Sequence, residues 1–177
     1  MKSYKEVTEI IKGESDRGAV LIAAAMVELE LENLLKAKLV DSDKKKDSIF
    51  EHNGPLGNFS SKIEMAYRLG LITQKQNLMF NTFRKLRNQF AHSSVSLSLE
   101  DDAIKDQLEA VFNHNSDIKD LFVTAVQATA ESHDLPNEII NQDLKSGRYM
   151  LNMVFSLEIL ALHFAQDKVI KIERKDG

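Results

Sequence analysis

Apolar residues recur every three to four positions along most of the chain, which is the period of an α-helix and not that of a strand. This spacing predicts helices over about residues 2–12, 17–40, 61–70, 74–92, 100–112, 117–131 and 137–166. Few helix breakers interrupt the pattern, because the chain has only 7 glycines and 2 prolines. We therefore expect an all-α, single-domain helical bundle of about six or seven helices over residues 1–177.

The segment from Arg17 to Val40 is the predicted centre of this bundle. Its first half reads GAVLIAAAMV and is apolar on every side, so we expect it to be buried on all sides. Its second half alternates glutamate with leucine, as a short strand would, but its length and its content of Ala, Leu, Glu and Lys favour a helix. Ser15 or Asp16 can cap its first turn.

Local signals mark where other helices begin and end. Ser60 or Ser61 can cap the third helix, and Gly70 has the position of a glycine that follows a helix end. Thr73 and Gln76 match a capping box and open the next helix. Three segments lack helical signals and are predicted to be a loop, an extended connector and a frayed charged tail: 41–59, 93–99 and 171–177.

The composition of the chain limits its expected cellular location and the kinds of site that it can carry. The chain has no cysteine, which excludes disulfides, thiolate catalysis and cysteine-ligated zinc. The first ten residues lack the apolar core of a signal peptide, and the longest apolar run, Ala19–Val27, is too short to span a bilayer. A net charge of −4 provides no overall positive excess for DNA phosphates. We expect a cytoplasmic protein that does not contact membranes.

The densest cluster of candidate chemistry is the sequence RKLRNQFAH at residues 84–92. On a helix, one apolar stripe is formed by Met79, Phe83, Leu86 and Phe90. Asn88 and His92 fall on the opposite side, because residues four apart share a helix face. Arg84 and Arg87 lie on the flank between the two sides. The candidate interaction surface therefore consists of Arg84, Arg87, Asn88 and His92.

Residue spacing alone leaves two interpretations of this surface open. In the first, the helix end loosens so that Arg87 binds a phosphate and His92 transfers a proton. In the second, which helix-end electrostatics favour, the arginines pair with acids such as Glu28 or Glu32 and the histidine binds carbonyls of its own helix. Arg17, just before the buried segment, is either a charge partner at a helix end or a neighbour of this surface.

The sequence gives little indication of a metal site, a phosphate-binding loop or a DNA-binding element. The histidines form no HxxxH or HExxH pair and the glycines form no phosphate-binding loop, so we expect no metal and no cofactor. Residues 62–87 are the best match to a helix-turn-helix. Their second helix opens with the polar residues 74–77, but Phe80 and Phe83 occupy its central face and the surroundings are not basic. The pattern identifies no DNA-reading residue, and direct DNA contact stays an open question.

Three segments taken together resemble the mannitol operon repressor family of bacterial transcriptional regulators. They are Asp16–Glu28, Phe59–Ile63 followed by Ala66–Ile72, and Leu86–His92. The order of the segments agrees with the family, and the resemblance covers about residues 15–130. It implies an all-helical cytoplasmic protein that represses genes for mannitol uptake and use.

The sequence Arg-Asn-x-x-x-His at Arg87–His92 also resembles a motif of the HEPN superfamily of helical bundles. Many HEPN proteins are metal-independent ribonucleases or partners of nucleotidyltransferases, and their arginine and histidine typically meet across a dimer interface. The resemblance implies that Arg87 would stabilise a phosphate, that His92 would act in proton transfer and that Asn88 would support both. It also implies a homodimer through this polar face.

The leading expectation is a non-enzymatic repressor of the mannitol operon that acts through a protein partner. An acidic chain without a convincing recognition helix is poorly suited to grip DNA by itself. The alternative is a ribonuclease dimer that uses Arg87 and His92. A second alternative is a protein-interaction scaffold without nucleic-acid contact.

Overall fold

The computed structural model describes residues 4–114, 120, 123–124 and 146–175. Six helices are bounded in this part of the chain: α1 (Tyr4–Lys12), α2 (Asp16–Lys38), α3 (Phe59–Arg68), α4 (Gln74–His92), α5 (Asp102–His114) and α8 (Gly147–Gln166). The same part contains no strand, so the predicted all-α fold is confirmed. Of the helix expected at 117–131, only residues 120, 123 and 124 are described. The helix expected at 137–166 begins later than predicted, at Gly147, because Ser146 is extended and caps it by accepting a hydrogen bond from the Tyr149 amide. Residues 137–145 lie outside the described residues.

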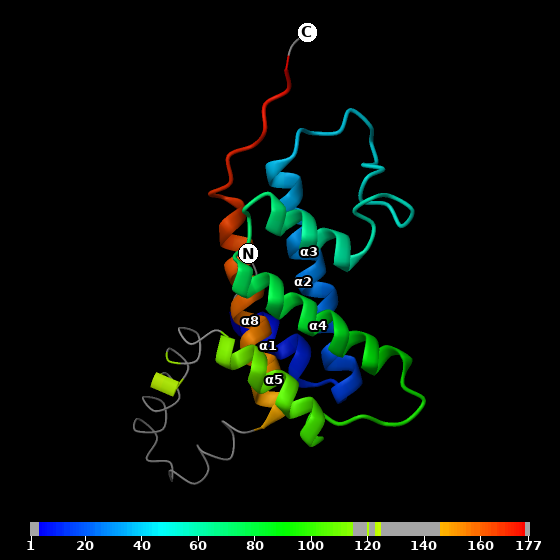
Figure 1. Ribbon diagram of the computed structural model, residues 1–177, viewed down its shortest axis with the longest axis vertical. Coiled ribbons are helices and arrows are strands. Elements are labelled where there is room, and N and C mark those ends of the chain that lie inside the picture. The colour runs from blue at the N-terminus through cyan, green and yellow to red at the C-terminus, as the bar shows by residue number, and fades with distance from the viewer. Residues whose placement is uncertain (1–3, 115–119, 121–122, 125–145, 176–177) are drawn as a thin grey trace.

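Helix α2 lies in the middle of the bundle, in contact with α1, α3, α4 and α8 (Figure 1). The side chain of Ser15 caps its first turn by accepting a hydrogen bond from the Gly18 amide at 3.1 Å. The inner side of α2 is fully buried and consists of Ala19, Val20, Ala23, Ala24, Val27, Leu31, Leu34 and Leu35. The predicted central position of this helix is confirmed.

The outer side of α2 corrects one prediction, because the first half of the helix is not buried on all sides. Leu21, Ile22 and Met26 are half-buried and Ala25 is exposed. Leu29, one turn further along, is 52% exposed. The buried positions of α2 all lie on its inner side, where the neighbouring helices pack. An apolar stripe of sequence therefore remains on the outside of the described bundle.

The turn from α3 to α4 orients the helix that carries the candidate surface. Helix α3 is capped by Asn58, whose side chain accepts a hydrogen bond from the Ser61 amide at 2.9 Å. The predicted cap at Ser60 or Ser61 is wrong, because the helix already begins at Phe59 and the residue before it, Asn58, is the cap. The helix ends as expected before Gly70, whose φ of 68° is a left-handed conformation that favours glycine.

Helix α4 begins with the predicted capping box. The Gln76 amide donates to the hydroxyl of Thr73 at 3.2 Å, and the Gln76 side chain accepts from the Thr73 amide at 3.0 Å. The amide nitrogen of the Gln76 side chain also donates to Glu158 of α8 at 3.0 Å. Deeper in the core, Phe83 stacks on Phe155 with ring centroids 3.6 Å apart. These contacts hold α4 against α8 and direct its apolar stripe inward.

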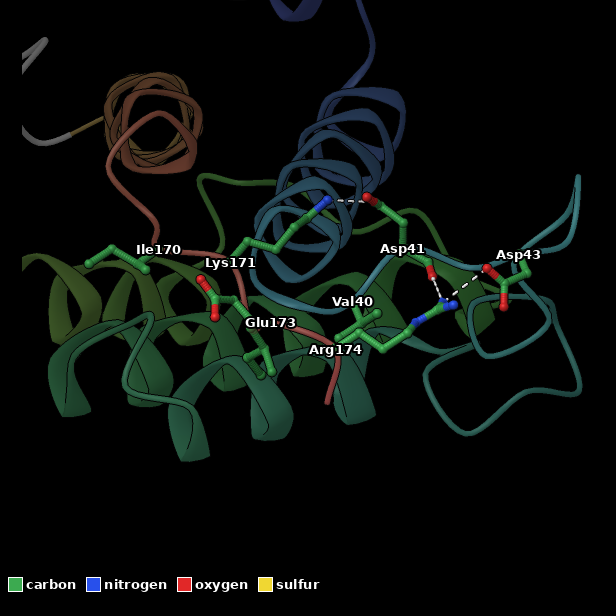
Figure 2. A pocket seen from close by; sticks show the side chains of 8 residues that line it. Val40, Asp41, Asp43, Ile170, Lys171, Glu173 and Arg174 are labelled. Atoms are coloured by element: carbon green, nitrogen blue, oxygen red, sulfur yellow. Dashed lines mark hydrogen bonds and ion pairs between the residues drawn. The ribbon is translucent and has the colours of Figure 1, made fainter. Parts of the chain in front are cut away.

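The charged tail was predicted to fray. Through residue 175 it does not, because it lies against the loop after α2. The amide of Ile172 donates to the carbonyl of Lys38 at 2.8 Å. Figure 2 shows two ion pairs between the tail and the loop, of which Arg174 with Asp43 measures 2.9 Å. Tail and loop together line a shallow hollow of about 580 Å³. The ion-pair side chains are exposed, so each pair contributes little stability.

Candidate interaction surface

The two sides of α4 differ as its periodicity predicts. The apolar stripe is buried and comprises Met79, Phe83, Leu86 and Phe90, joined by Phe80. Arg84, Arg87 and Asn88 are half-buried along the polar flank, and His92 is exposed as the last residue of the helix. The four residues of the candidate interaction surface thus lie outside the core, within three turns of one helix.

Neighbouring amide side chains hold the guanidiniums of α4. Arg84 Nε donates to Asn81 Oδ1 at 3.4 Å, and Arg87 Nη1 donates to Asn88 Oδ1 at 3.0 Å. Asn81 in turn donates to the Asn77 side chain at 2.9 Å. The acceptors are neutral oxygens, so these contacts orient the arginines without compensating their positive charge.

The acids expected to pair with these arginines are bound by Lys62 of α3. The Lys62 ammonium lies 3.0 Å from Glu28 and 2.9 Å from Glu32, and the lysine is only 5% exposed. Burial alone would lower the pKa of Lys62, but hydrogen bonds to Glu32 and Glu28 outweigh it, so the pKa is raised. The prediction that Arg84 or Arg87 pairs with these glutamates is therefore wrong.

The sequence around Lys62 carries a signal for this buried charge. Lys62 occupies the buried side of α3, among Phe59, Ile63 and Ala66. A charged group at such a position requires a carboxylate partner, because unpaired charges are rarely buried. The pattern therefore indicates that a partner exists. Only the packing of α3 on α2 shows which residues provide it.

Arg17 of α2 joins the candidate surface from a second helix. Its Nη2 donates to the backbone carbonyl of Ser93 at 2.7 Å. Ser93 directly follows α4, so Arg17 lies beside the end of α4 that carries His92. Of the two expectations for Arg17, proximity to the RKLRNQFAH segment is the one that the structure supports.

The three arginines share one electrostatic property. Within the described residues, Arg17, Arg84 and Arg87 form no ion pair and bond only to neutral oxygens. Each of the other arginines described has a carboxylate partner: Arg68, Arg148 and Arg174. We call the set of Arg17, Arg84, Arg87, Asn88 and His92 the arginine face.

Guanidinium groups bind carboxylates and phosphates through pairs of parallel hydrogen bonds. The arginine face offers three such groups, two of them held by asparagines. Catalysis by Arg87 and His92 would need the two side chains to converge on one phosphate. Within one copy, in the part of the chain that the structure describes, no hydrogen bond joins them, since Arg87 binds Asn88 and His92 is exposed at the helix end.

Two further findings concern the residues that the structure describes. No group of three or more His, Asp or Glu side chains among them is arranged to hold a metal ion. None of their helices combines the length and the apolar character needed to cross a membrane. His163 is partly buried, with its Nδ1 3.4 Å from the Glu30 carboxylate.

The fold and this surface define an all-α bundle with an arginine-bearing face. The chain belongs to the mannitol repressor family, because the model of that family matches residues 5–169. The resemblance noted in the sequence is thus confirmed and extends beyond the 15–130 range on which it was based.

Among solved structures, the chain is similar to one from Escherichia coli described as the complex of MtlR with HPr. The TM-score is 0.62 and the identity 16%, over 90% of this chain and 97% of that one. At this identity the likeness shows a shared fold. No curated protein matches the chain.

Proposed function

We propose that this protein is a cytoplasmic repressor of the mannitol operon that acts through a protein partner docked on the arginine face. Membership of the mannitol repressor family supports the regulatory role. The observation that carries the docking site is that Arg17, Arg84 and Arg87 bond only to neutral oxygens in the described structure. A surface with uncompensated guanidiniums complements a partner that presents carboxylates or phosphates.

Two features argue against DNA reading by the protein alone. The chain carries a net charge of −4, whereas DNA-binding domains concentrate positive charge on the bound face. In the candidate helix-turn-helix formed by α3 and α4, Gln76 is engaged by the capping box and by Glu158. Asn77 accepts a hydrogen bond from Asn81. Two of the residues at the start of α4 are therefore committed to contacts inside the protein.

HPr is the partner that the comparisons suggest for this chain. The solved relative from Escherichia coli is a complex of MtlR with HPr, and it shares this fold. We infer that an HPr molecule of the same cell binds the arginine face and thereby changes repression. The required complementary feature is an acidic or phosphate-bearing patch on HPr opposite the three arginines.

Two titrations of the purified protein test this function. In the first titration, HPr from the same organism is added to the protein and binding is measured by calorimetry. The other compares mannitol promoter DNA with a scrambled duplex at low and at physiological salt. We expect HPr to bind and the two duplexes to behave alike, with any binding lost as salt rises. Promoter-specific binding that persists at physiological salt would overturn partner-mediated repression.

Variants of the arginine face locate the docking site. The double substitution Arg84→Ala and Arg87→Ala should weaken HPr binding about tenfold or more, because central arginines often dominate interfaces. Arg68→Ala is the matched control, since Arg68 is exposed on α3 and bonds only weakly to Glu64 at 3.8 Å. If the double variant binds HPr as tightly as the control does, the docking site lies elsewhere.

A further inference from the structure

The two arginines of α4 are held by asparagines that lie in opposite directions along the helix. Arg84 bonds backwards to Asn81, three residues earlier, with 3.4 Å between Nε and Oδ1. Arg87 bonds forwards to Asn88, the next residue, with 3.0 Å between Nη1 and Oδ1. All four side chains are half-buried on the polar flank of the helix. Each guanidinium group is therefore placed beside its own asparagine.

The positions of the two asparagines determine how far apart the guanidinium groups lie. Asn81 and Asn88 are seven residues apart in α4, which is close to two complete turns. They therefore lie on the same side of the helix, about 10 Å apart along its axis. The guanidinium groups beside them have a separation of the same order. A single phosphoryl or carboxylate group is too small to bridge it, so Arg84 and Arg87 must bind two separate anions.

Both guanidinium groups keep a pair of parallel donors for an acceptor outside the protein. Arg84 uses Nε for its asparagine, so its two terminal amino groups remain. Arg87 uses Nη1, so Nε and Nη2 on the other edge remain. Within the described residues, neither group makes a further hydrogen bond. Such a pair of N–H donors matches the two oxygens of a carboxylate.

We propose that the arginine face recognises two separate carboxylates about 10 Å apart on its protein partner, one bound by Arg84 and one by Arg87. Two acidic side chains provide this spacing, whereas one phosphorylated residue offers a single anion. On a partner helix, the spacing corresponds to acidic residues seven positions apart, which lie two turns apart on one side. The inference rests on the proposed function and specifies the chemistry of the docked partner. In it, Asn81 and Asn88 are positioning residues that act through the arginines.

Two helical peptides of the same composition test the spacing without HPr. Each carries two glutamates in an alanine-rich helix, seven positions apart in one peptide and four positions apart in the other. The NMR signals of the arginine Nε–H groups report binding to the wild-type protein. We expect the first peptide to bind about fivefold more tightly or better, because only its carboxylates reach both arginines. Arg84→Ala should remove this preference, whereas Arg68→Ala, the exposed control on α3, should keep it.

A double-mutant cycle with HPr tests the role of the asparagines. Asn81→Ala should weaken HPr binding about threefold or more in the wild-type protein. It should have no effect in an Arg84→Ala background, because the asparagine acts only through the arginine. Gln89→Ala is the matched control, since Gln89 is an exposed amide on the same helix, and it should change binding little in either background. A merely structural role of Asn81 would weaken binding equally in both backgrounds.

The results separate this inference from the proposed function. If HPr binds but the wild-type protein does not distinguish the two peptides, the two-carboxylate inference is wrong and repression through HPr stands. If the first peptide is preferred but HPr does not bind, the spacing stands and HPr is the wrong partner. Inorganic phosphate is the third probe. Phosphate binding that is lost equally in Arg84→Ala and in Arg87→Ala would show that both arginines converge on one anion, and the inference would fail.

Discussion

At the scale of single residues, Glu158 is the most unusual titratable group among those described. It lies on α8, is 2% exposed and accepts a hydrogen bond from the side chain of Gln76. Burial raises the pKa of the Glu158 carboxyl above its ordinary value, and the bond from Gln76 opposes this only in part. The folded protein therefore holds this proton to a higher pH than the unfolded chain does.

The raised pKa of Glu158 determines how the stability of the protein changes with pH. Because the folded state binds the proton more tightly, stability falls as pH rises from about 4.5, the ordinary value, through the raised pKa of Glu158. Glu158→Gln keeps an acceptor for Gln76 and removes the buried charge. We expect this variant to be more stable than the wild type in urea unfolding at pH 8, and the difference to vanish below pH 4.5.

Glu109→Gln provides the control for this prediction, because Glu109 is an exposed acid on α5. It should leave the pH dependence of unfolding unchanged. A Glu158→Gln variant that is less stable than the wild type at pH 8 would show that the ionised carboxylate is well accommodated.

At the scale of elements, the turn between α3 and α4 depends on the backbone conformation of Gly70. Gly70 adopts a φ of 68°, and a β-carbon there would contact nothing within 4 Å. The position thus requires glycine for its backbone conformation and not for space. Gly70→Ala should cost about 1 kcal/mol of unfolding free energy, and Gly70→Asn less, because asparagine tolerates this conformation better. Equal losses in thermal or urea unfolding would contradict this explanation.

At the scale of the whole molecule, Arg148 joins α8 to the junction of α1 and α2, which lies far from it in sequence. From the first turn of α8, its guanidinium donates to the Asp16 carboxylate at 3.0 Å and to the carbonyls of Ile11 and Glu14, each at 2.7 Å. The bonds tie the end of α1 and the start of α2 to α8. A planar fork with several donors is needed to reach these acceptors together.

We expect that a lysine at position 148 cannot make the contacts of Arg148. Arg148→Lys keeps the charge but cannot reach the acid and both carbonyls at once, so we expect a loss of about 2 kcal/mol in urea unfolding. Arg68→Lys is the control, because Arg68 has an exposed pair with Glu64 at 3.8 Å, and it should change stability little. Similar stability of the two variants would mean that Arg148 acts as a simple charge.

The sequence by itself determined helix α4 and the family. Helical spacing, the Thr73–Gln76 capping box and Gly70 predicted α4 with its correct start and orientation, since these signals act within a few residues of one another. Spacing along one helix is also a local property, so the sequence predicted that Arg84 and Arg87 lie on the polar flank of α4. Family membership followed because it rests on the order of short segments, which folding does not alter.

Only the tertiary structure decided which distant residues meet and which surfaces are left uncovered. Lys62 binds the glutamates of α2 that were expected to pair with the arginines, and this leaves Arg84 and Arg87 on neutral acceptors. The outer side of α2 is only partly buried, although the first half of the helix is apolar all round. Both outcomes depend on how the helices pack, because long-range contacts determine burial and pairing, and residue spacing along one helix does not carry that information.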